Sequence, residues 1–182
     1  MNETNKKRIS KFLSLVLRHQ PEHIGLNLDK NGWAKVNELI EKSKTKHILF
    51  SFPELEAIVV TNDKQRFAFN ADKTKIRANQ GHSLMTIDLQ LEAIQPPEFL
   101  YHGTVAKFID SIRTTGLEKR SRQHVHLSED RDTATKVGSR RGLPIILSIK
   151  SLEMHNKGHE FYRSENNVWL TDHVPVAFIE FQ

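Results

Sequence analysis

A double proline at positions 96 and 97 is the feature that most constrains how this chain of 182 residues can fold. Proline fixes its own φ angle and lacks a backbone donor, so two in succession end the preceding element and stiffen the chain. Helical periodicity prevails before this point, and short apolar runs typical of strands prevail after it. The sequence therefore predicts an α+β protein with two domains, residues 1–93 and 94–182.

The first half begins with apolar residues at helical spacing, which predict a helix over residues 8–19 that Pro21 ends. Arg18 and His19 fall in its last turn, where the helix dipole favours positive charge. They either cap the helix or contribute to a site. Two further helices are expected after it, one capped by Asn37 and one opened by a capping box of Ser51 and Glu54.

A basic hairpin and the loop after it are the candidate phosphate-binding elements of the first half. Residues 66–78 alternate like a hairpin, and helices followed by such a hairpin favour a winged-helix lobe. Arg66 and Arg77 lie on this predicted wing, where a guanidinium group can bind phosphate through two parallel hydrogen bonds. The irregular segment that follows suits a phosphate-binding loop, so Arg77, His82 and Ser83 are candidate substrate-binding residues. The alternative is a solvated hairpin with charged edges and an ordinary turn.

The second half opens with two apolar runs that each end in a His-x-Ser/Thr triplet, His102-Gly103-Thr104 and His126-Leu127-Ser128. A run of helical period lies between them, with Gly116 as its expected C-cap. Imidazoles and hydroxyls thus sit at the ends of strands, where binding sites are commonly built. Ser128 is expected to cap the next helix, and Arg140 and Arg141 after that helix are expected to be solvated. Further strands are expected at 144–149, 161–162, 168–171 and 174–181.

Composition excludes several function classes. Cysteine is absent, which rules out disulfides and thiolate chemistry and makes the cytoplasm the expected compartment. No apolar run is long enough to span a membrane, and no signal peptide is expected. Most of the net charge of +5 falls in the first half, where it favours contact with nucleic acid. No P-loop, dinucleotide-binding motif or metal-ligand spacing is found, so no metal is expected.

Histidines, hydroxyls and arginines with few neighbouring acids are the chemical inventory that remains. Such groups suit the stabilisation of phosphate charge and proton transfer. Two function classes are consistent with them: an enzyme acting on RNA phosphate, and a non-catalytic winged-helix module that binds RNA. The paired triplets are also similar to those of NAD-independent phosphoesterases, although their short separation here would make such a core cramped.

Taken together, the motifs resemble those of a known family, the NAD-dependent RNA 2′-phosphotransferases of tRNA splicing, of the KptA type. The match covers nearly the whole chain, and its specificity comes from the order and spacing of the motifs. They are residues 11–19, Asn31-Gly32-Trp33, 64–67, 76–78, 81–83, 99–104, 124–128, 134–138 and 167–171.

The resemblance implies an N-terminal winged-helix lobe that holds RNA. It also implies a C-terminal, ADP-ribosyltransferase-like mixed α/β lobe with a split sheet, which holds NAD. The implied transferase moves an internal RNA 2′-phosphate to NAD through an ADP-ribosylated phosphate intermediate. Its products are 2′-hydroxyl RNA, ADP-ribose 1″,2″-cyclic phosphate and nicotinamide. The expected partners are RNA with a 2′-phosphate and NAD, and the protein is expected to be a monomer.

The resemblance also assigns roles to residues of both halves. It places an essential Arg-His-Arg-Arg set on Arg18, His19, Arg66 and Arg122, with Arg120 as the alternative to Arg122. It places NAD contacts on Tyr101, His102, Gly103, Thr104, His126 and Ser128. Three arginines would offset the repulsion between a dianionic phosphate and the NAD pyrophosphate. His19 would position the phosphate or protonate the departing RNA 2′-oxygen.

Overall fold

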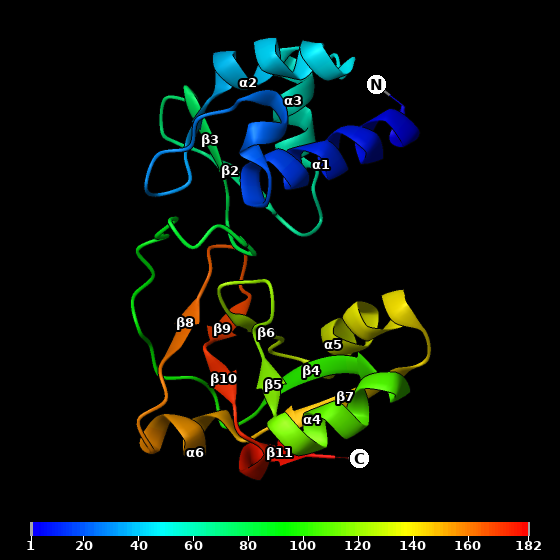
Figure 1. Ribbon diagram of the computed structural model, residues 1–182, viewed down its shortest axis with the longest axis vertical. Helices are drawn as coiled ribbons and strands as arrows, with labels where there is room; N and C mark the ends of the chain where they lie inside the picture. Colours follow the sequence, from blue (N-terminus) through cyan, green and yellow to red (C-terminus); the bar gives the residue numbers. More distant parts are fainter. Residues whose placement is uncertain (1, 182) are drawn as a thin grey trace. The chain divides into compact units, whose positions relative to one another are not determined.

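The computed structural model describes residues 2–181, which form two compact units that divide between residues 90 and 91. Each unit buries an apolar cluster of its own, as an independent domain must. The described residues contain six α-helices and small antiparallel sheets, so the predicted α+β class is confirmed (Figure 1). The winged-helix and ADP-ribosyltransferase-like character of the two halves stays a prediction. No helix of the described residues is long and apolar enough to cross a membrane.

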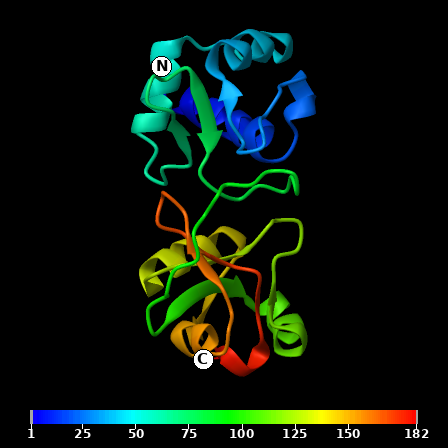
Figure 2. The ribbon, with the colours of Figure 1, turned by 90° about the vertical axis from the view of Figure 1, so that its left-hand side faces the viewer.

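The first unit combines three α-helices with a three-stranded antiparallel sheet in the order β1-β3-β2 (Figure 2). Its elements are α1 (Glu3–Arg18), η1 (Pro21–Ile24), β1 (Ala34–Lys35), α2 (Val36–Ser43), η2 (Lys44–Lys46), α3 (Phe52–Val60), β2 (Phe67–Phe69) and β3 (Lys75–Ala78). The predicted hairpin is confirmed, with Phe67 opposite Ala78 and Phe69 opposite Ile76. Apolar residues of α1 and α3 pack with the buried face of this hairpin in one core.

Local capping signals of the first unit were predicted with mixed success. The capping box of Ser51 and Glu54 opens α3 as expected. The start of α1 was predicted too late, because Asn2 accepts a hydrogen bond from the backbone N–H of Asn5 and caps the helix there. The prediction that Asn37 caps α2 is wrong. That helix starts directly from β1, whose end is held by the bond from Val36 N–H to the carbonyl of Thr74.

The second unit is built from short antiparallel pairs around one core. Its elements are β4 (Leu100–Val105), η3 (Ala106–Phe108), α4 (Ile109–Thr115), β5 (Leu117–Glu118), β6 (Val125–Leu127), α5 (Arg131–Gly138), η4 (Ser139–Arg141), β7 (Pro144–Ile149), α6 (Ser151–Asn156), β8 (Phe161–Arg163), β9 (Trp169–Thr171), β10 (His173–Val174), η5 (Val176–Phe178) and β11 (Ile179–Glu180). Two three-stranded sheets have the orders β11-β7-β4 and β6-β9-β8, and β10 pairs with β5. The expected strand over 174–181 is therefore interrupted by η5 and divided between two partners.

The two three-stranded sheets meet at a single bridge between Tyr101 and Ser128, whose backbones exchange two hydrogen bonds of 2.8 Å. This pairing explains why the prediction of Ser128 as a helix cap is wrong. Ser128 continues β6, and the cap of α5 is Asp130, whose carboxylate accepts from the backbone N–H of Thr133 at 2.7 Å.

Helix α5 lies against β4 and β7, as Figure 1 shows. A Cβ atom built on Gly103 would overlap the carbonyl oxygen of Ala134 and lie 2.9 Å from the backbone nitrogen of Gly138. The helix backbone therefore rests directly on the strand, and this approach requires glycine at position 103.

The proline segment and the residues before it belong to the second unit. The backbone N–H of Ile94 donates to the carbonyl of Phe161 at 2.8 Å, and Ala93 bridges Tyr162. The hydroxyl of Ser151 donates to the carbonyl of Pro97 at 2.7 Å. The stiff segment is thus anchored along the second unit.

We expect Gly103→Ala to lower the free energy of unfolding of the second unit by about 3 kcal/mol, because the added methyl group meets helix backbone that cannot rotate away. In a Trp33→Phe background, Trp169 is the only tryptophan of the protein. Its fluorescence during urea denaturation would therefore report the unfolding of the second unit alone. Gly158→Ala is the control, because Gly158 has φ of +94° but open space around it. It should cost about 1 kcal/mol from backbone strain alone. Equal losses in the two variants would contradict the close approach of α5.

Candidate functional site

The C-terminal end of α1 carries two of the predicted residues and is held by a third. His19 is the C-cap of this helix, and its Nδ1 lies 3.0 Å from the hydroxyl of Ser83. The backbone N–H of Ser83 donates to the carbonyl of Arg18 at 3.0 Å. Ser83 therefore contacts a freed carbonyl of the helix end and the imidazole beside it, and so fixes the orientation of His19.

The turn before β2 brings the backbone of Arg66 to the same place. The Nη2 group of Arg18 donates to the carbonyl of Arg66 at 3.4 Å, and its guanidinium lies 5.8 Å from the ring centroid of Phe67. Asn79 fixes this turn from the end of β3. Its backbone N–H donates to the carbonyl of Arg66 at 2.9 Å, and its amide donates to the carbonyl of Gln65 at 2.6 Å.

Arg77 lies on the half-exposed face of β3, since its neighbours Ile76 and Ala78 are buried. Its guanidinium stacks over the ring of Trp33 at 4.5 Å from the centroid. Stacking on an aromatic ring orients the plane of a guanidinium without using its N–H groups.

His82 is buried, with 1% of its surface exposed, and neither of its ring nitrogens has a hydrogen-bond partner among the described residues. Burial, followed by the positive charges of Arg18, His19 and Arg77, lowers the pKa of His82 from 6.5 to about 4. The ring is therefore neutral at pH 7. Positive charges of Arg18, His19 and Arg77 thus converge around one buried imidazole, and the carbonyl of Arg66 lies beside Arg18. We call this part of the first unit its cationic end.

The second unit places its two predicted histidines in one chain of hydrogen bonds. The Nδ1 group of His102, on β4, donates to the carbonyl of His126, on β6, at 3.1 Å. The Nη1 group of Arg122 lies 3.2 Å from Nδ1 of His126. A guanidinium has only donors, so Nδ1 of His126 is the acceptor and a neutral His126 carries its proton on Nε2.

His102 is held neutral by its surroundings. Burial lowers its pKa, the carbonyl of His126 acts in the opposite direction, and the charges of Arg122 and Arg141 lower the pKa further. Because its Nδ1 donates to a carbonyl, a neutral His102 keeps Nε2 as an acceptor. The two imidazoles therefore differ in role: Nδ1 of His102 donates to a carbonyl, whereas Nδ1 of His126 accepts from Arg122.

Strand alternation separates the other residues that the sequence grouped with His102. Tyr101 points to the opposite face of β4, where the guanidinium of Arg131 lies 5.6 Å from its ring centroid. Gly103 is on that face too and serves the approach of α5. Thr104 shares the face of His102 and is buried. The structure thus brings His102, His126 and Arg122 together and places Tyr101 and Gly103 elsewhere.

Arg122 rather than Arg120 contacts the histidine pair, through His126. Burial lowers the pKa of Arg122, and the nearby charges of Arg141 and Arg140 lower it further. The guanidinium of Arg120 instead lies 5.1 Å from the ring centroid of Phe108. This geometry favours Arg122, and not Arg120, as the last arginine of the predicted Arg-His-Arg-Arg set.

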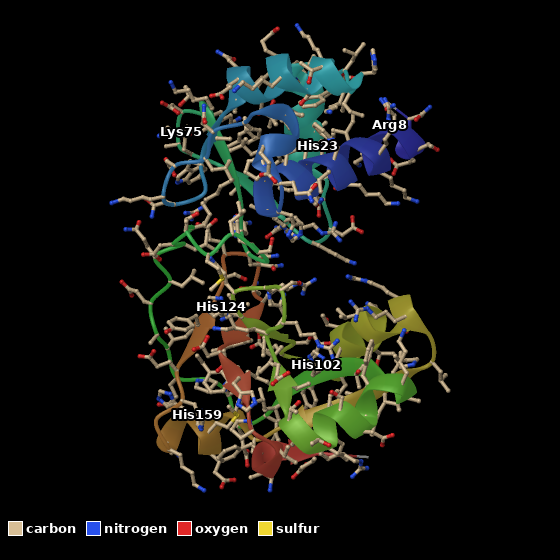
Figure 3. All side chains as sticks on the ribbon, viewed as in Figure 1. Arg8, His23, Lys75, His102, His124 and His159 are labelled. Carbon is tan, nitrogen blue, oxygen red and sulfur yellow. The ribbon has the colours of Figure 1, made fainter. Side chains whose placement is uncertain are left out.

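The remaining histidines do not join this group. In Figure 3, His124 and His159 lie away from His102, and the ring of His124 packs 5.6 Å from that of Tyr162. No group of three or more metal-ligating side chains occurs within residues 2–181.

Several residues of these clusters were not singled out from the sequence as site residues. Asn79 and Trp33 hold Arg66 and Arg77 in place, and Arg131 covers Tyr101 and donates to the hydroxyl of Ser148 at 3.4 Å. The position of Trp33 in a shared motif was the only signal for it. The backbone bond of Asn79 extends the predicted hairpin by one pair, so the alternation of residues 66–78 was a signal for it. The contacts of Arg131 cross between segments distant in sequence, and no local pattern reveals them.

Comparison with known proteins places the chain in a family. Residues 4–173 match the sequence model of the family described as "RNA 2'-phosphotransferase, Tpt1 / KptA family". The chain is 61% identical, over the whole length of both proteins, to a protein of Flavobacterium johnsoniae named "Probable RNA 2'-phosphotransferase". Proteins with the same name from Rhodopirellula baltica and Streptomyces coelicolor are 52% and 47% identical, over 94% and 100% of this chain and 94% and 98% of their own lengths.

The buried His82 predicts a specific loss of stability in acid. The unfolded chain takes up a proton at His82 as the pH falls below 6.5, whereas the folded chain does so only near pH 4. The free energy of unfolding should therefore fall by about 3 kcal/mol between pH 6.5 and pH 4 on account of this residue alone. His82→Gln should remove that part of the decline in urea denaturation measured across this range.

The exposed His23 provides the control for this measurement. His23→Gln removes an exposed imidazole, and a change of the acid decline as large as that in His82→Gln would contradict the role of burial at His82. An unchanged acid decline in His82→Gln would mean that His82 is not held neutral by burial.

Proposed function

The chain belongs to the RNA 2′-phosphotransferase family, Tpt1/KptA, and from this premise we propose that it is a transferase that removes a 2′-phosphate from RNA by transfer to NAD. The observation that carries the proposal is the extent of the family match, which runs from residue 4 to residue 173 and so includes both clusters of functional residues. The alternatives of an NAD-independent phosphoesterase and a non-catalytic RNA-binding module do not account for both clusters.

The cationic end of the first unit is proposed to hold the RNA 2′-phosphate. The last carbonyls of α1 give this end of the helix a partial negative charge, which would repel an anion. Arg18, His19 and Arg66 supply the opposing attraction, and arginine can bind two phosphate oxygens at once. Arg77 and Ser83 are proposed to contact the RNA beside that phosphate, and the neutral His82 supports the loop that carries Ser83.

The histidine pair of the second unit is proposed to bind NAD, a substrate that the reaction consumes. A ribose hydroxyl can donate to Nε2 of His102, and the imidazole of His126 beside it is proposed to contact the same ribose. The charge of Arg122 beside them favours the approach of a phosphate. Thr104 and Ser128 are proposed as further hydrogen-bond partners of NAD, whereas Gly103 acts through the packing of α5.

The proposed reaction has two steps. An oxygen of the RNA 2′-phosphate first forms a bond with the anomeric carbon of the nicotinamide ribose, and the bond to nicotinamide breaks. The ribose 2″-hydroxyl then attacks phosphorus, and the bond between phosphorus and the RNA 2′-oxygen breaks. His19 is proposed to give a proton to that oxygen. The products are 2′-hydroxyl RNA and ADP-ribose 1″,2″-cyclic phosphate, and no metal is required.

Incubation with 2′-phosphorylated RNA, with and without NAD, tests the proposal directly. We expect loss of the 2′-phosphate only with NAD, together with one nicotinamide released for each phosphate removed. Release of inorganic phosphate without NAD would identify a phosphoesterase instead. Binding of the RNA without any reaction under either condition would identify a binding module.

Arg66→Ala tests the phosphate-binding role of the first unit. We expect the rate of phosphate removal to fall by at least about a hundredfold, because a positive charge next to the reacting phosphate is removed. The affinity for NAD, measured by calorimetry, should stay as in the unchanged protein. Lys73→Ala is a matched control, since Lys73 lies in the turn of the same hairpin and pairs with Glu56 at 2.5 Å. A normal rate in Arg66→Ala would overturn this assignment.

A further inference from the structure

Three cations of the second unit gather around the ring of Phe108, and a fourth adjoins them. The Nζ atom of Lys107 lies 4.9 Å from the ring centroid, and the Cζ atoms of Arg120 and Arg141 lie 5.1 and 5.7 Å from it. Arg140 precedes Arg141 in η4. We call Lys107, Arg120, Arg140 and Arg141 the basic cluster. It draws on three separate connections of the fold: the end of β4, the turn after β5, and the turn before β7.

The charges of the basic cluster are not balanced by acids. None of the ion pairs within residues 2–181 includes one of its four members. The three charges around Phe108 lie within about 11 Å of one another, close to the Debye length of about 10 Å at 0.1 M salt, so they act together as one positive field. This field reaches Arg122, whose pKa is lowered chiefly by burial and then by Arg141 and Arg140.

The cluster is available to a ligand. All four of its cations are exposed, although the two arginines of η4 were expected from the sequence to be only solvated surface. Leu143 follows them and is 88% exposed, so an apolar side chain stands beside the charges. Like charges held together at a surface without acids cost free energy in the unbound protein, and an anion relieves that cost.

We propose that the basic cluster binds the phosphodiester backbone of the RNA at nucleotides flanking the 2′-phosphate. This inference rests on the proposed function, because it concerns how the same substrate is held. A polynucleotide carries one negative charge for each nucleotide. Its charges are therefore spread along the strand, as the cations of the basic cluster are spread over three connecting segments of the fold. The pyrophosphate of NAD, in contrast, is a compact group with two charges. Arg122 and the hydrogen-bonding groups of β4 and β6 lie closer to the histidine pair than the basic cluster does, so they suit the pyrophosphate better. Leu143 is positioned to contact a base or a ribose of the bound strand.

The double variant Arg140→Gln/Arg141→Gln tests this role in the full chain. We expect its KM to rise about tenfold for a 2′-phosphorylated RNA of about 20 nucleotides, with a much smaller change in the KM for NAD. For a 2′-phosphorylated dinucleotide, which lacks the flanking backbone phosphates that the cluster is proposed to bind, the KM should rise much less than for the long RNA. The slope of log affinity for the long RNA against log salt should become shallower by about 0.7 for each phosphate that the variant no longer neutralises.

Arg113→Gln is the control for net charge. Arg113 is also exposed and also stacks on an aromatic ring, 4.3 Å from the centroid of Phe181, but it lies outside the cluster. Equal weakening of long-RNA affinity in Arg113→Gln would overturn the proposal, because the effect would then be one of bulk charge. A raised KM for NAD with an unchanged KM for RNA would overturn it too and assign the cluster to NAD.

A binding measurement separates this proposal from the proposed function. Fluorescence anisotropy with an RNA that lacks the 2′-phosphate, in the absence of NAD, reports binding of the RNA backbone without any reaction. Weaker binding by the double variant would support the cluster even if the unchanged protein removed no phosphate, in which case only the proposed activity would fail. Unchanged binding by the double variant would overturn the proposal that the basic cluster binds the RNA backbone.

Discussion

The second unit depends on a junction only a few residues wide. Backbone pairing of Tyr101 with Ser128 joins its two three-stranded sheets, and the next residue of β4, His102, donates to the carbonyl of His126. The same junction therefore holds the fold together and sets the proton positions of the two imidazoles. A one-residue shift in the register of either strand would turn His102 toward α5 or bring a different carbonyl to it. The glycine beside His102 limits such a shift, because only Gly103 admits the helix backbone.

Each unit also concentrates like charges that the fold must hold against repulsion. In the first unit, Arg18, His19 and Arg77 surround an imidazole that burial keeps neutral. In the second unit, Arg122 lies in the field of Arg140 and Arg141. Backbone carbonyls and aromatic rings offset part of this cost, as the contacts of Arg18 with Arg66 and of Arg77 with Trp33 show. Arrangements of this kind favour an anionic ligand, since binding relieves repulsion that folding leaves in place.

Elements with a strong local signal were predictable from the sequence. Pro21 ends α1 near Arg18 and His19, and the capping box at Ser51 opens α3. The alternation of residues 66–78 forms a hairpin. The wrong caps at Ser128 and Asn37 arose where a distant segment paired with the backbone of the same stretch. Ser128 is a good capping residue, but its backbone pairs with Tyr101, and Asp130 takes the cap instead. Asn37 does not become a cap for a similar reason, because α2 begins directly at the end of β1.

The sequence by itself determined which residue types are present and which are neighbours along the chain. It identified two His-x-Ser/Thr triplets, an Arg-His pair at a helix end, a basic hairpin, and the resemblance that connects them. Only the tertiary structure decided that His102 faces His126 while Tyr101 faces α5, that His82 is buried and neutral, and that cations from three connections converge near Phe108. The physical reason is that local patterns record backbone preferences within about one turn or strand. Burial and electrostatic fields depend instead on groups brought together from distant positions in the chain.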